Sequence, residues 1–356
     1  MRACRHLPGL GLLAMKMPPA TLRGIAEQLN VHVSTVSRVL NGNLENVGRV
    51  ASRETIERIR ELAAQLNYQP NTHARTLKTR RSREIAILVP RLSDIVMATI
   101  YEGIDEAASA HHYTAFVANT LDRPERQREL AERALGRNVE GLLICDAHAG
   151  SENTYLEELA ERQVPFVLVS RPRGSHCAIT ADDELGGRLA AEHLFALGHR
   201  RVAMIAGAAY SNNALARTAG FVGYYREHGV EIGAERIIHG PFDTQAGFDI
   251  GARLLQHPPL PTAIFAVNDF LAVGLIGAMR QRGLLPGRDI AVVGYNDTPL
   301  AEHLQIPLTS ISTCMHSQGR LAVETLLRRI AGEPVQSHRF VPIMSVRASS
   351  QCGPGA

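Results

Sequence analysis

Three polar side chains near the amino end of the chain have a spacing suited to contact with a polyanion. Ser34, Ser37 and Arg38 recur at positions i, i+3 and i+4, so a helix would place them on one face. Hydroxyl and guanidinium groups on such a face can donate hydrogen bonds to phosphate oxygens or to base edges in the major groove of DNA. The alternative is an ordinary helical hairpin whose arginine is simply solvated.

The surrounding sequence predicts three short helices that would position this polar face. The first would take Thr21 as its N-cap and has apolar residues at helical spacing, Leu22, Ile25, Ala26 and Leu29. The second, about residues 33–40, has Val36, Val39 and Leu40 on its inner side and ends at Asn41-Gly42. The third would be capped by Ser52 and turns five apolar residues inward, Ile56, Ile59, Leu62, Ala63 and Leu66. Two helices joined by a tight turn, with a polar second helix, form a helix-turn-helix that can enter the major groove.

The charge distribution favours a polyanion partner for this front part alone. Residues 17–83 hold 11 Lys/Arg and five Asp/Glu, whereas residues 84–356 hold 24 and 30, although the net charge of the whole chain is only +3. The stretch NTHARTLKTRRSR, residues 71–83, contains five Lys/Arg and no acidic residue. A helix this short is marginal in water, so we expect a linker that folds on contact with its partner.

The pattern changes from Ile85 onward, where short apolar strands alternate with amphipathic helices. Eight such strands are expected: IAILVP, YTAFVAN, VEGLLICD, PFVLVS, RVAMIAG, RIIHG, TAIFAVND and IAVVGYND. Near-continuous apolar strands separated by helices indicate parallel sheets that are covered on both faces. Eight units exceed one compact sheet, so the sequence predicts an α/β fold with two lobes.

Several classes of protein lack support in the sequence. The five cysteines are scattered and include no CxxC pair, which fits reduced thiols in a cytosol and no zinc site. No apolar stretch approaches the roughly 20 residues of a membrane span. Neither GxGxxG nor GxxxxGK[ST] follows the first strand and GxSxG is absent, so we expect no cofactor and no catalytic residues. Two short stretches contain potential metal ligands, Asp146-Ala147-His148 and His111-His112. Neither supplies the spread-out set of ligands that a metal site requires.

Several stretches together resemble the lactose/galactose repressor family of bacterial transcription regulators. They are TLRGIAEQLNVHVSTVSRVLNG, NYQPNTHARTLKTRRS, FAVNDFLAVG and VVGYNDTPLAEHLQIPLTSI, and the resemblance runs from about Thr21 to about Arg347. It implies an N-terminal three-helix helix-turn-helix domain, a hinge helix and a two-lobed, periplasmic-binding-protein-like core of doubly wound parallel sheets. The expected division is a disordered or misassigned extension 1–16, a DNA-binding domain 17–69, a hinge 70–83, a first lobe 84–180 with 311–345, a second lobe 181–310 and a tail 346–356.

The resemblance also implies roles for individual residues at the DNA. Val33 and Ser34 match positions that read bases, Ser37 and Arg38 match contacts to backbone and bases, and Leu77 matches a leucine that wedges into a base step of the minor groove. An alternative for Leu77 is packing on its helical neighbour alone. The complete set expected at the DNA is Thr21, Val33, Ser34, Thr35, Ser37, Arg38, Asn41, Tyr68, Asn71, Ala74, Arg75, Leu77 and Lys78.

Three departures from the family pattern affect the details of these contacts. His32 stands where a capping serine is usual, and histidine caps poorly, at a cost of about 1 kcal/mol. Gly24 replaces the acidic residue of a capping box, and the connection 43–49 is a few residues longer than usual.

In the large part, polar residues follow the strands and predict a small polar ligand between the lobes. From strand ends and resemblance together, the expected ligand residues are Val96, Met97, Arg171, Ser211, Asn213, Arg217, Phe242, Asn268 and Asn296. Arg171 has a surface turn as its alternative and Arg217 a structural salt bridge, whereas Asp269 and Asp297 are expected to be helix caps. The two arginines together hint at a sugar acid.

These inferences converge on a cytoplasmic, homodimeric, sequence-specific DNA-binding regulator of the repressor type. A sugar or sugar acid would close the lobes and thereby change affinity for a palindromic operator. The tail VRASSQCGPGA has no leucine heptads, so a dimer is expected. The alternatives are a solute-binding protein or a sugar-processing enzyme with the same α/β core, although an envelope solute-binding protein would lack the basic front and carry an export signal.

Overall fold

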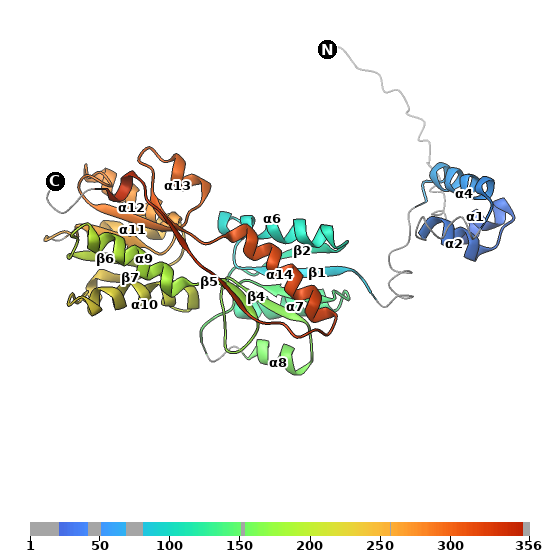
Figure 1. The fold of residues 1–356 in the computed structure, drawn as a ribbon, viewed down its shortest axis with the longest axis horizontal. Helices are drawn as coiled ribbons and strands as arrows, with labels where there is room; N and C mark the ends of the chain where they lie inside the picture. Colours follow the sequence, from blue (N-terminus) through green and yellow to red (C-terminus); the bar gives the residue numbers. More distant parts are fainter. Residues whose placement is uncertain (1–20, 42–50, 69–80, 151–153, 257, 352–356) are drawn as a thin grey trace, which may run out of the picture. The chain divides into compact units, whose positions relative to one another are not determined.

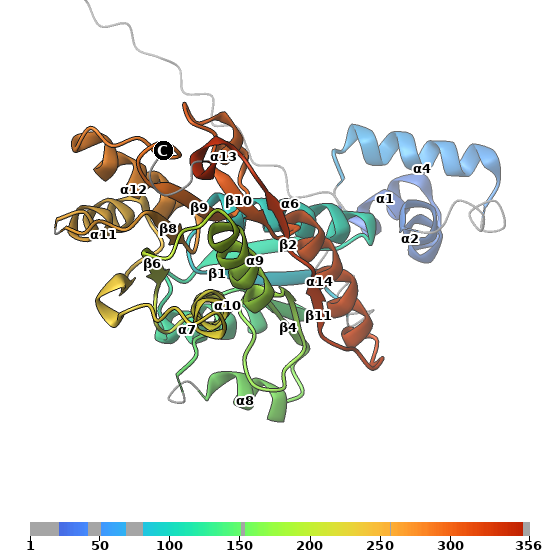
Figure 2. The same cartoon turned by 60° about the vertical axis from the view of Figure 1, so that its left-hand side comes forward.

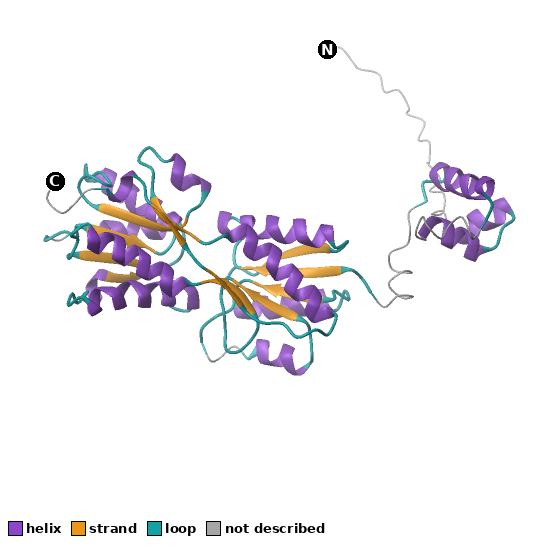
Figure 3. Ribbon diagram, viewed as in Figure 1, coloured by secondary structure: helices purple, strands orange, loops and turns teal. Residues whose placement is uncertain are grey.

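The computed structural model describes residues 21–41, 51–68, 81–150, 154–256 and 258–351. The chain divides between Arg81 and Ser82 into two compact units (Figure 1), and Figure 3 distinguishes their helices from their strands. Several predictions lie outside the described residues: the extension 1–16, the connection 43–49, most of the hinge, and the DNA residues Asn71, Ala74, Arg75, Leu77 and Lys78.

Among its described residues, the small unit contains three helices around one apolar core. They are α1 (Leu22–Leu29), α2 (Val33–Asn41) and α4 (Arg53–Gln65). The core is formed by residues that the helical spacing had marked as inward, namely Ile25, Ala26, Val36, Val39, Ile56, Ile59 and Ala63, with Leu22, Leu29, Leu40, Leu62 and Leu66 partly buried against them. The predicted three-helix arrangement is therefore confirmed.

The helix ends of this unit show how the turn is fixed. Thr21 Oγ1 accepts the Gly24 N–H at 3.1 Å and Ser52 Oγ accepts the Thr55 N–H at 3.3 Å, so both predicted caps are confirmed. Asn30, with φ of 51°, ends α1 in the left-handed conformation that asparagine tolerates. His32, expected to be a poor cap, does form a cap contact, because its Nδ1 lies 3.2 Å from the Ser34 backbone nitrogen and accepts that N–H. The imidazole nitrogen thus takes the place of a serine hydroxyl.

The large unit contains two six-stranded sheets with the same strand order. In the first lobe the strands are β1 (Glu84–Val89), β2 (Thr114–Asn119), β3 (Gly141–Ile144), β4 (Phe166–Val169), β5 (Ala178–Ala181) and β11 (His338–Phe340). Their order across the sheet is β11-β5-β4-β3-β1-β2, and all neighbours are parallel. The helices of this lobe are α6 (Ile95–Ala110), α7 (Pro124–Leu135), α8 (Tyr155–Glu161) and α14 (Met315–Ile330).

The second lobe repeats the arrangement with an antiparallel edge. Its strands are β6 (Val202–Gly207), β7 (Ile237–His239), β8 (Ala263–Ala266), β9 (Ala291–Asn296), β10 (Thr309–Ser312) and β12 (Ile343–Ser345). The order is β12-β10-β9-β8-β6-β7, and only β12 is antiparallel to its neighbour among these strands. The helices are α9 (Asp183–Ala196), α10 (Asn212–Glu227), α11 (Thr244–Leu254), α12 (Asp269–Gln281) and α13 (Pro299–His303), with 3₁₀ turns η1 (Ala234–Arg236) and η2 (Ala348–Ser350).

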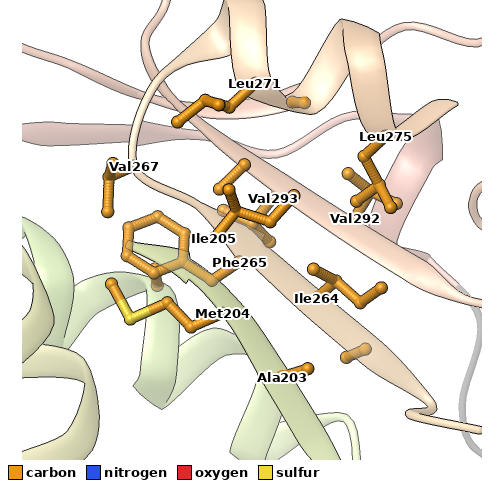
Figure 4. Packing of buried hydrophobic residues seen from close by; sticks show 14 of the residues in the cluster. Ala203, Met204, Ile205, Ile264, Phe265, Val267, Leu271, Leu275, Val292 and Val293 are labelled. Atoms are coloured by element: carbon orange, nitrogen blue, oxygen red, sulfur yellow. The ribbon is translucent and has the colours of Figure 1, made fainter. Parts of the chain in front are cut away.

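Helices cover both faces of each sheet, as the near-continuous apolar strands predict. In β1, Ile85 and Ile87 join the core beneath α6 and α14, whereas Ala86 and Leu88 face the core beneath α7 and α8. Figures 1 and 2 both show α14 beside α6. In the second lobe, strand residues such as Phe265 and Val293 pack with α12 in the core shown in Figure 4. Alternate side chains of a single strand therefore serve two separate layers.

The chain passes between the two lobes three times, which moves the predicted lobe boundaries by a few residues. It leaves the first sheet after β5, returns after β10, and leaves again between β11 and β12. Residues 309–312 and 343–345 therefore belong to the second lobe, although 311–345 was expected in the first. The described part of the expected tail packs on the second lobe, where Ser349 Oγ accepts the Thr309 N–H at 2.8 Å and donates to the Val292 carbonyl at 2.6 Å.

Helices α9 and α10 approach closely enough to require glycine at their contact. A Cβ atom on Gly220 would overlap the carbonyl oxygen of Glu184, and one on Gly187 would overlap that of Arg217. Gly223 lies one turn further along α10 and has no atom within 4 Å of such a Cβ.

We expect Gly220→Ala to lower the stability of the large unit by about 1–3 kcal/mol, because the two helices must move apart. The matched variant Gly223→Ala should raise it by up to about 1 kcal/mol, since alanine favours a helix where space is open. Thermal unfolding of both variants against the parent protein measures the difference. Equal effects of the two substitutions would contradict this account of the helix contact.

Candidate functional site

The outer face of α2 carries the polar residues expected at DNA. Ser34 and Arg38 are exposed, Thr35 and Ser37 are half-buried, and the Val33 side chain at the start of the helix is 39% exposed. Thr21 is engaged as the cap of α1, and Tyr68 packs partly buried against the core. Asn41 is the last residue of α2, and its side chain lies outside the described residues. Val36 and Val39 anchor the opposite face, so the polar face is presented by a fixed helix.

The large unit contains a cavity of about 490 Å³ between its two lobes. The cavity adjoins a recess of about 40 Å³, and Pro90, Asp94, Arg171 and Phe242 line both. The first lobe contributes residues that follow β1, β2 and β4, and the second lobe contributes residues that follow β6 and β7 and begin α11 and α12. This position beyond the carboxyl ends of the strands is where open α/β sheets bind ligands.

Arg171 in this cavity is held by an acidic residue that the sequence had not marked. Its Nη1 and Nη2 donate to Asp122 Oδ1 and Oδ2 at 2.7 and 3.2 Å, and the two side chains are only 7% and 11% exposed. The guanidinium carbon also lies 5.8 Å from the ring centre of Tyr210 and 5.7 Å from that of Phe242. Arg171 is thus a pocket residue and not a surface turn, but its charge is already paired.

Asp122 joins the two lobes. Tyr210, which follows β6 in the second lobe, donates its hydroxyl to Asp122 Oδ2 at 2.8 Å, and His148 Nε2 lies 3.1 Å from Oδ1. The rings of His148 and Tyr210 stack with centres 4.4 Å apart. Burial would raise the pKa of Asp122, but the hydrogen bonds from His148, Arg171 and Tyr210 hold it well below its usual value. The carboxylate is therefore the charged centre of a contact between the lobes.

Arg217 is likewise paired, at the base of the recess. Its Nε donates to Asp183 Oδ1 at 2.8 Å, its Nη1 donates to the Val267 carbonyl at 2.7 Å, and its guanidinium carbon lies 3.7 Å from the centre of the Tyr295 ring. Arg217 both lines the recess and forms a buried salt bridge, so the two alternatives for this residue coexist.

Asp94 provides a carboxylate that faces both spaces. It is the N-cap of α6, where Oδ1 accepts the Val96 N–H at 3.0 Å. Burial raises its pKa, although the Val96 hydrogen bond and the charges of Arg171 and Arg217 oppose this. Asp94 was not among the ligand residues expected from the sequence.

The other predicted ligand residues divide into those that line the cavities and one that does not. Val96, Met97, Asn213, Asn268, Asn296 and Phe242 line the recess together with Arg171 and Arg217. Ser211 is fully buried, hydrogen-bonds to Asn213 and lies outside both linings. Asn296, with φ of 95°, holds a backbone conformation that non-glycine residues rarely adopt, a feature often found at functional sites.

Two predicted helix caps are wrong. The cap of α12 is Asn268, whose Oδ1 accepts the Leu271 N–H at 2.8 Å, and not Asp269. Asp269 is instead buried, and it accepts hydrogen bonds from Thr298 N at 2.7 Å and Ser310 Oγ at 2.6 Å. Asp297 pairs with Arg347 Nη1 at 2.6 Å instead of capping α13. The burial that decides these roles depends on strands distant in sequence.

The charges along the cavity nearly balance. Three arginines, Arg91, Arg123 and Arg171, line it with three aspartates, Asp94, Asp122 and Asp243. Tyr210, Phe242 and Phe270 supply aromatic surface, and Ser93 and Thr244 supply hydroxyls. Such a lining suits a small polar molecule with both apolar faces and hydrogen-bonding groups.

The described ranges contain neither a candidate metal site nor a candidate membrane span. Within them no cluster of three or more His, Cys, Asp or Glu side chains is placed to hold a metal ion. None of the described helices is long and apolar enough to span a membrane. Cys145, Cys177 and Cys314 are free thiols.

Comparison with known proteins gives matches to both units. The model of bacterial regulatory proteins of the lacI family matches residues 21–71, and that of the periplasmic binding protein-like domain matches residues 191–350. The HTH-type transcriptional repressor PurR of Haemophilus influenzae (strain PittEE) is 30% identical over 328 residues, covering 91% of this chain and 96% of the relative. The ribose operon repressor of Escherichia coli (strain K12) is 30% identical over 339 residues, covering 93% and 100%.

Solved structures match across nearly the whole chain as well. The lac repressor dimer bound to operator and the anti-inducer ONPF has a TM-score of 0.85 at 28% identity, covering 94% of this chain and 100% of that one. The complex of the transcriptional regulator CelR with cellobiose has a TM-score of 0.70 at 28% identity, covering 93% and 99%.

The buried Asp269 beside the recess predicts a pH dependence of stability. Burial raises its pKa from 3.8 to about 6, so the native state binds this proton more tightly than the unfolded chain. The resulting stability is present below pH of about 4 and is lost as the pH rises through about 6. We expect the parent protein to lose about 1–3 kcal/mol across this window relative to Asp269→Asn. Calorimetric unfolding at several pH values tests this, and parallel pH profiles for the two proteins would refute it.

Proposed function

The chain belongs to the lacI family of bacterial regulatory proteins, and from this we propose a sequence-specific DNA-binding transcriptional repressor that responds to a small molecule. The helix-turn-helix unit would bind operator DNA through α2, and the large unit would bind the effector between its lobes. The observation that carries the proposal is the combination in one chain of an exposed polar helix on a three-helix unit with an interlobe cavity.

The form of the DNA-bound molecule is proposed by analogy with the structural relatives. The similar lac repressor structure is a dimer bound to its operator, and the similarity covers 94% of this chain. We propose a homodimer in the cytoplasm, with each α2 in one major groove of a palindromic operator, since two-fold protein symmetry matches two-fold DNA symmetry. The hinge residues Asn71, Ala74, Arg75, Leu77 and Lys78 would contact the central minor groove.

The effector is proposed to be a sugar-like polyol. A cavity of about 490 Å³ lies in the size range of small-molecule sites. The aromatic side chains of Tyr210, Phe242 and Phe270 can pack on the apolar faces of a sugar ring, and Asp94 can accept hydrogen bonds from its hydroxyls. The effector acts on DNA only through a difference in its affinity for the two states of the protein.

The alternative of a solute-binding protein or a sugar-processing enzyme shares the large unit. The small unit favours the regulator, because a helix-turn-helix with an exposed arginine serves no purpose in capturing a solute. The relatives named above are transcriptional repressors, and we assign no catalytic activity to the chain.

The deciding experiment combines DNA selection with ligand screening. The full-length protein is used to select duplexes from a random pool, and is then heated with a panel of sugars and sugar acids. We expect an enriched palindrome whose binding changes with one stabilising compound. Binding that shows no preference over random competitor DNA, with or without those compounds, would overturn the proposal.

Replacement of Arg38 should weaken operator binding. We expect Arg38→Ala to lower affinity by roughly tenfold or more, and to reduce the salt dependence by about one phosphate contact if Arg38 binds the backbone. The control is Arg53→Ala, whose side chain is 95% exposed and pairs with Glu57 on α4. Fluorescence anisotropy at several salt concentrations measures both. An unchanged affinity of Arg38→Ala would exclude a contact of this residue with DNA.

Replacement of Asp94 should uncouple the effector from the operator. Asn in this position keeps the cap of α6 but loses the charged acceptor, so we expect effector affinity to fall roughly tenfold while operator binding without effector is retained. Glu106→Gln is the control, because Glu106 lies on the exposed side of the same helix and pairs with Arg320. A parent-like effector response of Asp94→Asn would place the effector away from this carboxylate.

A further inference from the structure

We infer that Asp122 determines the charge specificity of the interlobe cavity, because it occupies the guanidinium of Arg171 and so leaves a site for an uncharged polyol. The inference rests on the proposed function in taking this cavity as the effector site. It reverses the expectation that Arg171 and Arg217 together would bind a sugar acid, and it assigns Asp122 a positioning role that acts through Arg171.

The geometry of the pair leaves Arg171 with little capacity for a ligand anion. Both Nη atoms donate to Asp122 in a fork, at 2.7 and 3.2 Å. This two-bond arrangement is the one in which arginine binds a carboxylate most strongly. A carboxylate or phosphate of the ligand would therefore have to displace Asp122 before it could bind Arg171 in the same way.

Asp122 is itself held in place from three sides. The Tyr210 hydroxyl and the His148 ring nitrogen bind its two oxygens at 2.8 and 3.1 Å. Leu121 and Asp122 both lie in the left-handed region, with φ of 59° and 57°, so the loop after β2 presents this carboxylate in a fixed backbone conformation. Displacing it would break the interlobe hydrogen bond along with the ion pair.

The remaining charges reinforce the preference for a neutral ligand. Arg217 is paired with Asp183 in the recess, and Asp94 adds a carboxyl group to the lining of both spaces. Arg91 and Arg123 line the cavity but are exposed, so water and salt screen them. Both buried arginines of the two linings are thus already paired with aspartates, so a ligand anion finds no free buried cation there.

The test uses inorganic phosphate as the probe and the full-length protein in three forms. Asp122→Asn frees Arg171, and the double variant Asp122→Asn with Arg171→Gln removes the freed cation again. Tyr210→Phe removes the interlobe hydrogen bond but leaves the ion pair. The unfolding temperature is measured at increasing phosphate concentrations, with chloride added to hold the ionic strength constant. Each variant is compared with the parent protein.

We expect phosphate to bind Asp122→Asn at least roughly tenfold more tightly than the parent protein, since a guanidinium without its carboxylate can form charge-assisted hydrogen bonds. The gain should be absent from the double variant and from Tyr210→Phe. A phosphate response of Asp122→Asn no stronger than that of the parent protein would overturn the inference, as would a gain that persists in the double variant.

If Asp122→Asn does not fold, a second variant, Arg171→Gln, tests the same inference. Arg171→Gln in the parent background should leave the phosphate response unchanged if Asp122 already occupies the arginine. A fall of that response would show that Arg171 binds anions in the parent protein, and would overturn the inference. Operator binding measured on the same preparations reports separately on the proposed function, because the phosphate comparison requires no DNA.

Discussion

The Asp122 carboxylate is the contact on which the geometry of the interlobe cavity depends. It binds Arg171 and His148, which follow two other strands of the first sheet, and Tyr210, which follows the first strand of the second. Its hydrogen bonds offset the cost of burying its charge, as its lowered pKa indicates. The same atoms thus fix one wall of the cavity, neutralise Arg171, the most buried arginine in its lining, and connect the lobes. A ligand that displaced the Asp122 carboxylate would break the ion pair and the interlobe hydrogen bond together.

The two lobes have similar folds but use different residues to pair the buried charges at their strand ends. Each sheet has the same strand order with its switch point between the first and third strands of its lobe, so each presents polar strand ends toward the other. The first lobe stabilises its edge with Asp122 and Arg171, and the second with the buried pair of Asp183 and Arg217 against Tyr295. Three crossings of the chain link the lobes, so a change in their closure must be absorbed at a few residues near 181, 313 and 341. This arrangement suits a module that opens and closes around a ligand.

The division of the chain into two units separates DNA binding from ligand binding. The described part of the small unit has three helices and one small core, so its stability comes from well-capped ends and close packing more than from size. His32 shows how such an end tolerates an unusual residue, because its ring nitrogen accepts the same backbone N–H that a serine would. The large unit holds the extensive cores that a ligand-binding module needs. DNA binding and ligand binding are then coupled through a difference in ligand affinity between two states of the protein. This coupling requires no site shared by the two ligands.

The sequence by itself determined the helices of the small unit, eight strands of the large unit and the family, because apolar spacing and short motifs are local properties. It did not reveal β5, β10, β11 or β12, because stretches of three or four residues such as AITA and TSIS are too short to show a strand pattern and are defined by the strands they pair with. It identified Arg171 and Arg217 but not their partners, which lie 49 and 34 residues away in the chain. It also misplaced the cap of α12 by one residue, since burial against Thr298 and Ser310 decides the role of Asp269. Which charges are paired, and hence what the cavity can bind, was decided by tertiary structure alone, because the energy of a charge depends on distances that the order of residues does not contain.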